Sequence, residues 1–305
     1  MNDLITDVKS LELETIKNLK NSKASNTLRA YQSDYKDFSL FCSKNGFLAM
    51  PTQPKIIALY LTHLSAFSKY STLKRRLASI NILHKTKGHY IDTKHPIIME
   101  NLMGIKRKNG SNQKGKKPLL ISNLKVLINV INKSKEKDKR KIRDKALLLI
   151  GFSGGFRRSE LVDIEHEDLE FVSEGVKIFV KKSKTDQSGE GMTKAIPYFD
   201  NENFCPVKAL KRWIEINDFK NSKIFNISDK NVALIIKKYA NQAGLDGQKY
   251  AGHSLRSGFA TSTAESGAEE RNIMAMTGHK STEMVRKYIK EANLFKNNAL
   301  NKINL

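Results

Sequence analysis

Apolar residues recur at three- and four-residue steps through the first hundred positions of the chain, with charged residues between them. This period is that of an amphipathic α-helix. It predicts one helix over residues 2–20 and a second from Ser25 to Cys42. Further helices are predicted over 57–64, after Ser71, and from Pro96, since proline suits the first turn of a helix. The first part of the chain is therefore predicted to be a compact unit of helices.

The pattern changes from Leu119 onward, where helical stretches surround three short runs rich in Val, Ile and Phe. The helices are predicted around 124–131, 142–152, 207–216 and 230–243, and the runs, read as strands, span 168–172, 176–180 and 193–198. The segment between the last two strands is polar and contains glycine, so it is predicted to be a flexible hairpin loop. The fold class predicted for the chain is mainly α with a small antiparallel β-sheet (α+β).

A basic segment separates the two parts. Residues 104–118 contain six Lys or Arg, three Gly and no acidic residue, which predicts a linker that runs along nucleic acid. Its cations are Lys106, Arg107, Lys108, Lys114, Lys116 and Lys117. The predicted organisation is a helical N-terminal domain (1–103), this linker (104–118), a second domain (119–290) and a C-terminal tail (291–305).

The net charge of +23 and the pI of about 9.8 make a polyanion the expected partner. Residues 1–118 hold 21 Lys and Arg against 8 Asp and Glu, and the remainder holds 33 against 23, so both parts are expected to contact it. In the first part, Lys74, Arg75 and Arg76 are candidates for phosphate contacts, and a solvated helix face is the alternative. Composition alone also fits a soluble basic protein such as a ribosome-associated factor.

The two cysteines, Cys42 and Cys205, lie far apart without metal-ligand spacing, so neither a zinc site nor a disulfide framework is predicted. The N-terminus is acidic and lacks the apolar stretch of a signal peptide, and no run approaches eighteen apolar residues. We therefore expect a soluble protein of the reducing cytoplasm.

Candidate chemistry lies near the end of the chain, in T-G-H-K-S-T-E-M-V-R-K-Y (277–288) and in H-S-L-R (253–256). Tyr288 follows His279 by nine residues, so a turn at Gly278 and a helix from Ser281 would return its hydroxyl towards the imidazole. A tyrosine that attacks a phosphodiester needs cationic hydrogen-bond donors on the phosphate oxygens, where charge accumulates in the transition state. No acidic metal cluster accompanies these residues in the sequence, so no metal is predicted.

Each of these pieces is weak alone, but they occur in a characteristic order. G-F-R-R-S-E-L (155–161) comes first, then a lysine in the predicted hairpin loop, then H-x-x-R, then G-H with a tyrosine nine residues on. In this order the sequence resembles the tyrosine recombinase (phage integrase) family over about residues 119–290. The helical first part with its basic linker is similar, on weaker grounds, to the core-binding domain of that family.

The resemblance assigns a role to each of five residues. Arg157 and Arg256 match the two arginines that clamp the phosphate, a task that suits the planar guanidinium fork. His253 matches the position that acts as base or proton shuttle, and His279 the position that donates to a phosphate oxygen. Tyr288 matches the nucleophile. An ordinary ion pair at a helix end is the alternative for Arg157.

The remaining family positions are matched less securely. Lys184 in the predicted loop matches the general acid that protonates the departing 5′-oxygen, with Lys181 and Lys182 close by as alternatives. Glu160 matches the acidic support residue, for which we expect a role in holding an arginine or the loop. Arg158 flanks the first arginine.

The resemblance implies a site-specific DNA recombinase or integrase, whose two domains close around duplex DNA as a clamp. It implies cleavage through a 3′-phosphotyrosyl intermediate, strand exchange through a Holliday junction, and a homotetramer on inverted-repeat sites. It implies no cofactor, because the covalent link conserves the bond energy. Accessory DNA-bending proteins are compatible with it, as is association with the nucleoid.

Two other functions use the same residues or fold. A type IB topoisomerase would relax DNA with the same side chains and without pairing two sites. A non-catalytic DNA-binding protein on this fold would have lost Tyr288 or an arginine, and neither is lost. A metal-dependent transposase would require clustered carboxylates, and no such spacing stands out.

The tail after Tyr288 predicts a short helix with one apolar stripe. Phe295, Ala299 and Ile303 recur every four residues, with Leu300 beside them. The resemblance favours docking of this helix on a neighbouring protomer, and packing on its own domain is the alternative.

Overall fold

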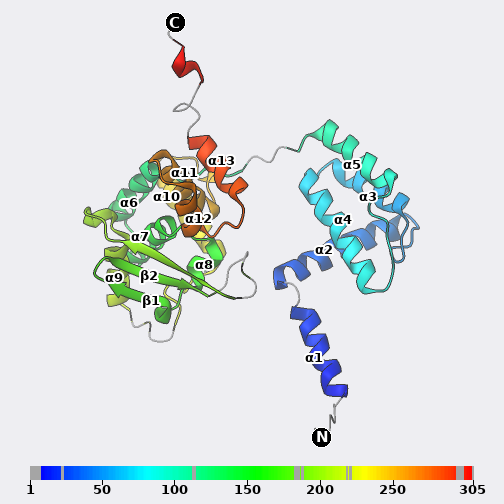
Figure 1. The fold of residues 1–305 in the computed structure, drawn as a ribbon, viewed down its shortest axis with the longest axis horizontal. Helices are drawn as coiled ribbons and strands as arrows, with labels where there is room; N and C mark the ends of the chain where they lie inside the picture. Colours follow the sequence, from blue (N-terminus) through cyan, green and yellow to red (C-terminus); the bar gives the residue numbers. More distant parts are fainter. Residues whose placement is uncertain are drawn as a thin grey trace. The chain divides into compact units, whose positions relative to one another are not determined.

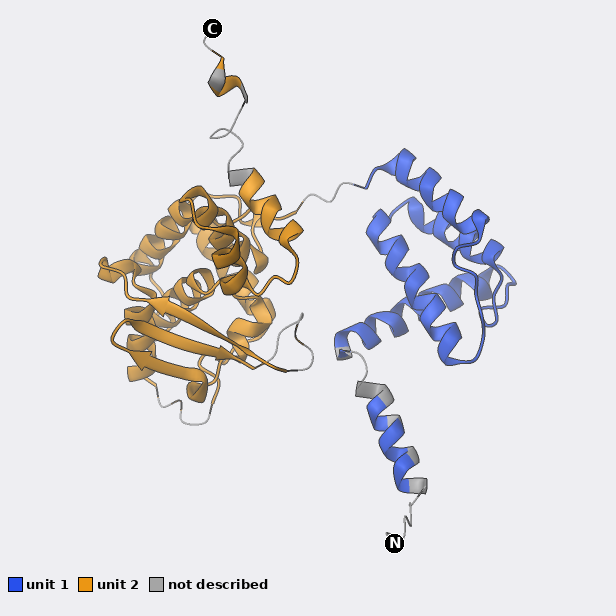
Figure 2. Ribbon diagram, in the orientation of Figure 1, with its two compact units in different colours: residues 1–114 blue, residues 115–305 orange. Residues whose placement is uncertain are grey.

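The computed structural model describes residues 8–21, 24–111, 115–181, 186, 189–217, 219, 222–292 and 299–303. The chain forms two compact units, residues 1–114 and 115–305 (Figure 2). None of the helices in these described ranges is both long and apolar enough to span a membrane.

The first unit is helical (Figure 1). Its helices are α1 (Val8–Asn21), α2 (Ser25–Lys44), α3 (Pro54–Ser65), α4 (Tyr70–Thr86) and α5 (Pro96–Asn109). Helix α2 packs against α4, and α3 packs against α5, around a core that includes Phe38, Tyr60 and Ile80. Proline stands at the first position of α3 and of α5, where its missing N–H leaves no helical hydrogen bond unmade.

The basic segment between the units is not a linker over its whole length. Helix α5 continues to Asn109 because Ile98, Leu102 and Ile105 keep a buried face at helical spacing. At the other end of the segment, the Lys117 N–H donates to the Lys249 carbonyl at 2.8 Å, which docks it on the second unit. The predicted linker of residues 104–118 is therefore shorter in the structure.

The second unit combines helices with one small sheet. The helices are α6 (Ile121–Lys133), α7 (Asp138–Ser153), α8 (Arg158–Asp163), α9 (Pro206–Glu215), α10 (Asp229–Gln242), α11 (His253–Glu265), α12 (Glu270–Thr277) and α13 (Thr282–Ala292). Short 3₁₀ turns are η1 (His166–Asp168), η2 (Glu202–Phe204), η3 (Gly247–Lys249) and η4 (Ala299–Lys302). The strands are β1 (Leu169–Val172), β2 (Gly175–Val180) and β3 (Met192–Pro197).

The three strands form one antiparallel sheet in the order β1-β2-β3. Leu169 pairs with Ile178 in the first ladder, and Ile178 pairs with Lys194 in the second. The predicted fold class, mainly α with a small antiparallel sheet, is confirmed.

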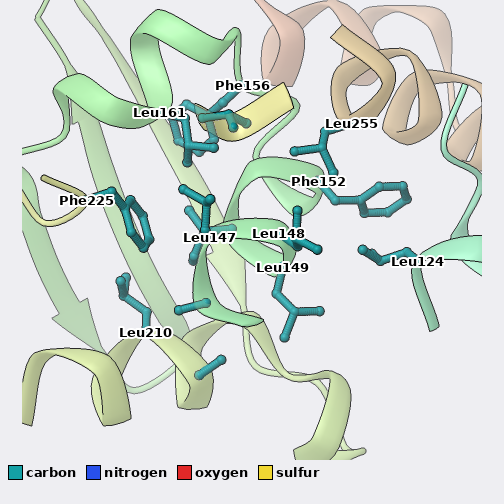
Figure 3. Packing of buried hydrophobic residues seen from close by; sticks show 14 of the residues in the cluster. Leu124, Leu147, Leu148, Leu149, Phe152, Phe156, Leu161, Leu210, Phe225 and Leu255 are labelled. Atoms are coloured by element: carbon teal, nitrogen blue, oxygen red, sulfur yellow. The ribbon is translucent and has the colours of Figure 1, made fainter. Parts of the chain in front are cut away.

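Helix α7 forms the centre of the second unit. Nearly every residue from Asp144 to Ser153 is buried, and Figure 3 shows Leu147, Leu148 and Phe152 among side chains from neighbouring elements. A helix that is apolar on all sides is buried on all sides. Its C-terminal end is therefore held rigidly, and the chain that follows it carries G-F-R-R.

The tail differs in part from its prediction. Of the predicted apolar stripe, Ala299 and Leu300 lie in the 3₁₀ turn η4, and Leu300 and Ile303 expose 65% and 56% of their surface. Phe295 lies outside the described residues.

Candidate active site

The segment between α7 and α8 places Arg157. Gly155 adopts a φ of +55°, and a Cβ there would lie 3.0 Å from the Phe259 ring and 3.1 Å from the Thr277 methyl group. Only glycine suits this close, left-handed turn. Arg157 is the N-cap of α8, and the buried Glu160 carboxylate accepts from its backbone N–H at 2.9 Å and from its Nη1 at 2.5 Å. Glu160 thus fixes both the start of α8 and the direction of the guanidinium.

Arg256 lies beneath Arg157, on the first turn of α11, with 1% of its surface exposed. Its Nη1 donates to the Gly155 carbonyl at 3.0 Å. Among the residues that the structure describes, none accepts a hydrogen bond from its buried Nη2. Burial and the Arg157 charge lower the pKa of Arg256 to about 10, which means that its charge is poorly compensated. Arg256 and Arg157 together therefore form a suitable binding site for an anion.

Tyr288 meets His253 across the α11–α13 contact. Its hydroxyl lies 3.2 Å from His253 Nε2, and 8% of the tyrosine is exposed. Desolvation and the charges of Arg256, Arg157 and Arg158 lower the pKa of His253, which also begins α11, where the helix dipole disfavours an imidazolium. A neutral imidazole beside the phenol can accept its proton.

Tyr288 is held by a small cluster of its own. Its ring packs with Val285 of α13, Ile273 of α12 and Ala260 and Ala264 of α11, apart from the main core of the unit. Among the described residues of α13, Val285 and Tyr288 are those classed as buried.

His279 approaches Tyr288 from the other side. Gly278 ends α12 in the left-handed conformation, with a φ of +63°, and turns the chain so that the His279 ring centroid lies 6.2 Å from that of Tyr288. Desolvation and the charges of Arg256 and Arg157 lower the pKa of His279 to about 4, so the ring is neutral at pH 7.

Thr277, which sequence reasoning missed, orients the His279 ring. Its hydroxyl is fully buried and lies 2.8 Å from His279 Nδ1 and 2.6 Å from the Ile273 carbonyl. The hydroxyl donates its one proton to the Ile273 carbonyl, so its oxygen accepts from His279 Nδ1–H and fixes the orientation of the ring. Donation from Nε2 to a phosphate oxygen then requires the imidazolium, which a bound phosphate favours.

Thr277→Val is expected to slow DNA cleavage about tenfold, the scale of one lost hydrogen bond, because the isosteric side chain can no longer accept from Nδ1–H and hold the His279 ring. Thr277→Ser keeps the hydroxyl and serves as the control. The measurement is single-turnover cleavage at saturating protein. Equal rates for the valine and serine variants would show that the orientation of the His279 ring is set elsewhere.

Of the lysines considered for the general acid, Lys184 and Lys182 lie outside the described residues. Lys181 is described and contacts three carboxylates, with Nζ at 2.5 Å from Glu165, 2.5 Å from Glu167 and 3.3 Å from Asp168. Hydrogen bonds to these carboxylates raise the pKa of Lys181, which makes this residue a poor proton donor.

Other predicted site residues have local partners. Arg158 pairs with Asp229 at 3.4 Å, and Lys116 Nζ donates to the Gln248 carbonyl at 2.6 Å. In the first unit, Arg75 pairs with Asp34, while Arg76 pairs with Asp37 and donates to the Tyr60 hydroxyl at 2.6 Å. These two arginines thus join α4 to α2.

The remaining candidate cations differ in exposure. Lys74, Lys106, Arg107, Lys108 and Lys117 are exposed, and Lys114 lies outside the described residues.

Comparison with known proteins gives a consistent result. The phage integrase family model matches residues 121–294. The "Integrase/recombinase xerD homolog" of Selenomonas ruminantium is 40% identical over 317 residues, covering 99% of this chain and 92% of that protein. "Tyrosine recombinase XerC" of Syntrophus aciditrophicus (strain SB) is 26% identical over 303 residues, covering 91% of each.

Two solved structures share the fold. The XerH site-specific recombinase bound to palindromic difH substrate, in a post-cleavage complex, matches with a TM-score of 0.69 at 19% identity, covering 95% of this chain and 85% of that one. A lambda integrase dimer bound to a COC′ core site matches with a TM-score of 0.59 at 18% identity, covering 96% and 98%.

Proposed function

Because this chain belongs to the phage integrase family of tyrosine recombinases, we propose that it is a site-specific DNA recombinase whose nucleophile is Tyr288. The observation that carries the assignment of the site is the contact of the Tyr288 hydroxyl with His253 Nε2, beside Arg157 and the buried, poorly compensated Arg256. A phosphodiester supplies both the electrophile for that hydroxyl and the negative charge for the arginines.

The residues then divide the cleavage step between them. Tyr288 Oη forms a bond to phosphorus while His253 Nε2 accepts the phenolic proton. Arg157, Arg256 and His279 hold the non-bridging oxygens, where charge grows in the transition state. The bond from phosphorus to the 5′-oxygen breaks, and that oxygen takes a proton from Lys184. The products are a 3′-phosphotyrosyl link and a free 5′-hydroxyl.

Rejoining reverses the same step. The 5′-hydroxyl of a partner strand attacks the phosphotyrosine and gives its proton back to Lys184, and Tyr288 leaves with the proton held by His253. Exchange of one pair of strands between the paired duplexes forms a Holliday junction, and exchange of the other pair resolves it. No cofactor is required, since one phosphodiester is exchanged for another of similar energy.

The test is formation of a covalent adduct on a nicked DNA site. The nick lets the short 5′-hydroxyl fragment diffuse away, so cleavage cannot be reversed and the protein stays attached through SDS. We expect the adduct to form in excess EDTA, because side chains of the chain supply the charge and protons. Loss of the adduct in EDTA, with recovery on adding Mg²⁺, would reject this mechanism. Relaxation of plasmids of any sequence without exchange between sites would favour the topoisomerase activity instead.

Lys184→Ala is expected to reduce cleavage of ordinary DNA about 100-fold, within the range of a lost general acid. A substrate with sulfur in place of the bridging 5′-oxygen should restore the rate, because a thiolate leaves without a proton. Lys182→Ala is the matched control in the same loop. Rescue of Lys182→Ala in place of Lys184→Ala would move the role by two residues.

The wider assembly belongs to the same proposal. The DNA partner would carry inverted repeats, each bound by one protomer, and four protomers would complete an exchange between two sites. Residues 1–103 would bind DNA as a separate domain through Lys74, and the basic segment that follows would add contacts from Lys106, Arg107 and Lys108, all of which are exposed. The reaction would occur in the cytoplasm, at the nucleoid, with DNA-bending proteins as accessory factors at some sites.

A further inference from the structure

A lysine lies buried beneath the proposed active site, on a strand to which the sequence gives no chemical role. Along β3, Thr193 and Ala195 are exposed, whereas Lys194 and Ile196 face the interior with 1% of their surface exposed. A lysine at a core-facing position is costly unless its ammonium group is fully engaged. The partners of Lys194 therefore indicate what it does.

The Lys194 ammonium joins the ends of two helices. Its Nζ donates to the Gly154 carbonyl at 2.8 Å and to the Met276 carbonyl, and it lies 4.9 Å from the centre of the Phe156 ring. Gly154 is the C-cap of α7, and Met276 is in the last turn of α12. Carbonyls at a helix C-terminus have no partner within the helix and carry partial negative charge, so a cation suits both.

Each of these helix ends leads directly to residues assigned to the phosphate. Gly154 precedes Gly155, whose carbonyl accepts from Arg256, and Arg157 follows two residues later. Met276 precedes Thr277, which contacts His279. Lys194 thus connects the arginine side of the site to the histidine side through hydrogen bonds to backbone carbonyls.

We propose that Lys194 is a positioning residue of DNA cleavage, which fixes the spacing between the Arg157–Arg256 pair and His279 on the bound phosphate. This inference rests on the proposed function of the site. It gives β3 a part in catalysis that is separate from that of the preceding loop.

The charge of Lys194 is sensitive to its surroundings. Desolvation and the nearby Arg256 and Arg157 lower its pKa to about 8, against the opposing effect of Glu160. A bound phosphate adds negative charge beside both arginines and favours the ammonium form. Since the protonated form is the one that binds the helix ends as a cation, cleavage is expected to fall as pH rises through about 8 at subsaturating DNA.

The experiment compares Lys194→Met with the control Lys177→Met. Lys177 lies on the neighbouring strand β2 and pairs with Glu170 on the surface. We expect Lys194→Met to bind a half-site with unchanged Kd and to form the covalent adduct at least about tenfold more slowly, the scale of a misplaced catalytic group. Lys177→Met should match the wild type in both. Normal adduct formation by a folded Lys194→Met protein would overturn the inference.

A double variant separates positioning from general stability. If Lys194 acts partly through His279, the fold reduction in the rate of adduct formation in the double variant Lys194→Met/His279→Ala is smaller than the product of the reductions in the two single variants. A reduction in the double variant equal to that product would show that Lys194 has only a structural role and does not act through His279.

A conservative variant covers the case in which Lys194→Met does not fold. Lys194→Arg keeps its charge at all working pH values, so its cleavage should no longer fall above pH 8 as that of the wild type does. Identical pH profiles for the two proteins would overturn the inference. Absence of any adduct with the wild type would instead reject the proposed function.

Discussion

Tyr288→Phe is expected to bind its DNA site with unchanged affinity and to form no covalent adduct. The substitution removes one oxygen from a side chain whose ring is 8% exposed and packed among Val285, Ile273 and Ala260, so the fold of α13 is retained. The missing oxygen is the one that lies 3.2 Å from His253 and attacks phosphorus in the proposed reaction. The measurement is SDS gel analysis of a nicked substrate beside a half-site binding titration.

Tyr250→Phe is the matched control for this experiment. Tyr250 is also buried in the second unit, at 5% exposure, and its hydroxyl accepts from Asn123 at 3.2 Å and has no assigned role in the reaction. It should form the adduct as the wild type does. An SDS-stable adduct from Tyr288→Phe would mean that another residue is the nucleophile.

Arg256→Met is expected to lower the cleavage rate by about 1000-fold, the upper range for loss of one transition-state charge partner in a buried site. The same substitution should leave the melting temperature close to that of the wild type. The guanidinium is 1% exposed and repelled by Arg157, as its lowered pKa of about 10 reflects, so methionine removes a charge that the folded protein holds at a cost. We therefore expect the substitution to reduce the cleavage rate without a matching loss of stability.

Arg271→Ala supplies the comparison for Arg256→Met. Arg271 lies on α12 with its side chain 83% exposed, in a surface pair with Glu269, and should leave cleavage unchanged. The two proteins are compared by single-turnover cleavage and by thermal unfolding. A cleavage rate for Arg256→Met within a few fold of the wild type would remove this arginine from the site.

The sequence predicted most of what local patterns determine. The runs rich in Val, Ile and Phe placed the three strands within about a residue of their observed ends, and the motifs at 155–161, 253–256 and 277–288 marked the segments that meet in the fold. The chemistry of Arg256, His253 and Tyr288 could be suggested because their spacing follows a known family order.

Contacts between distant segments could not be predicted in the same way. Arg75 and Arg76 resembled a phosphate-binding patch because Asp34 and Asp37, which neutralise them, lie about forty residues earlier in the chain. The role of Lys194 depends on two carbonyl groups from separate helices, and a backbone carbonyl leaves no mark in a sequence.

The small cluster that holds Tyr288 has a consequence for motion. The second half of α7, from Asp144 to Ser153, is buried and can open only when the unit unfolds, whereas the described side chains of α13 that are buried are Val285 and Tyr288. The free energy of local opening scales with the apolar surface that must be exposed, so α13 should detach more readily than the helices beneath it. Tyr288 is thus on a helix that is less costly to move than the segment that leads to Arg157. Displacement of this one short helix is expected to separate Tyr288 from His253 without unfolding the core of the unit.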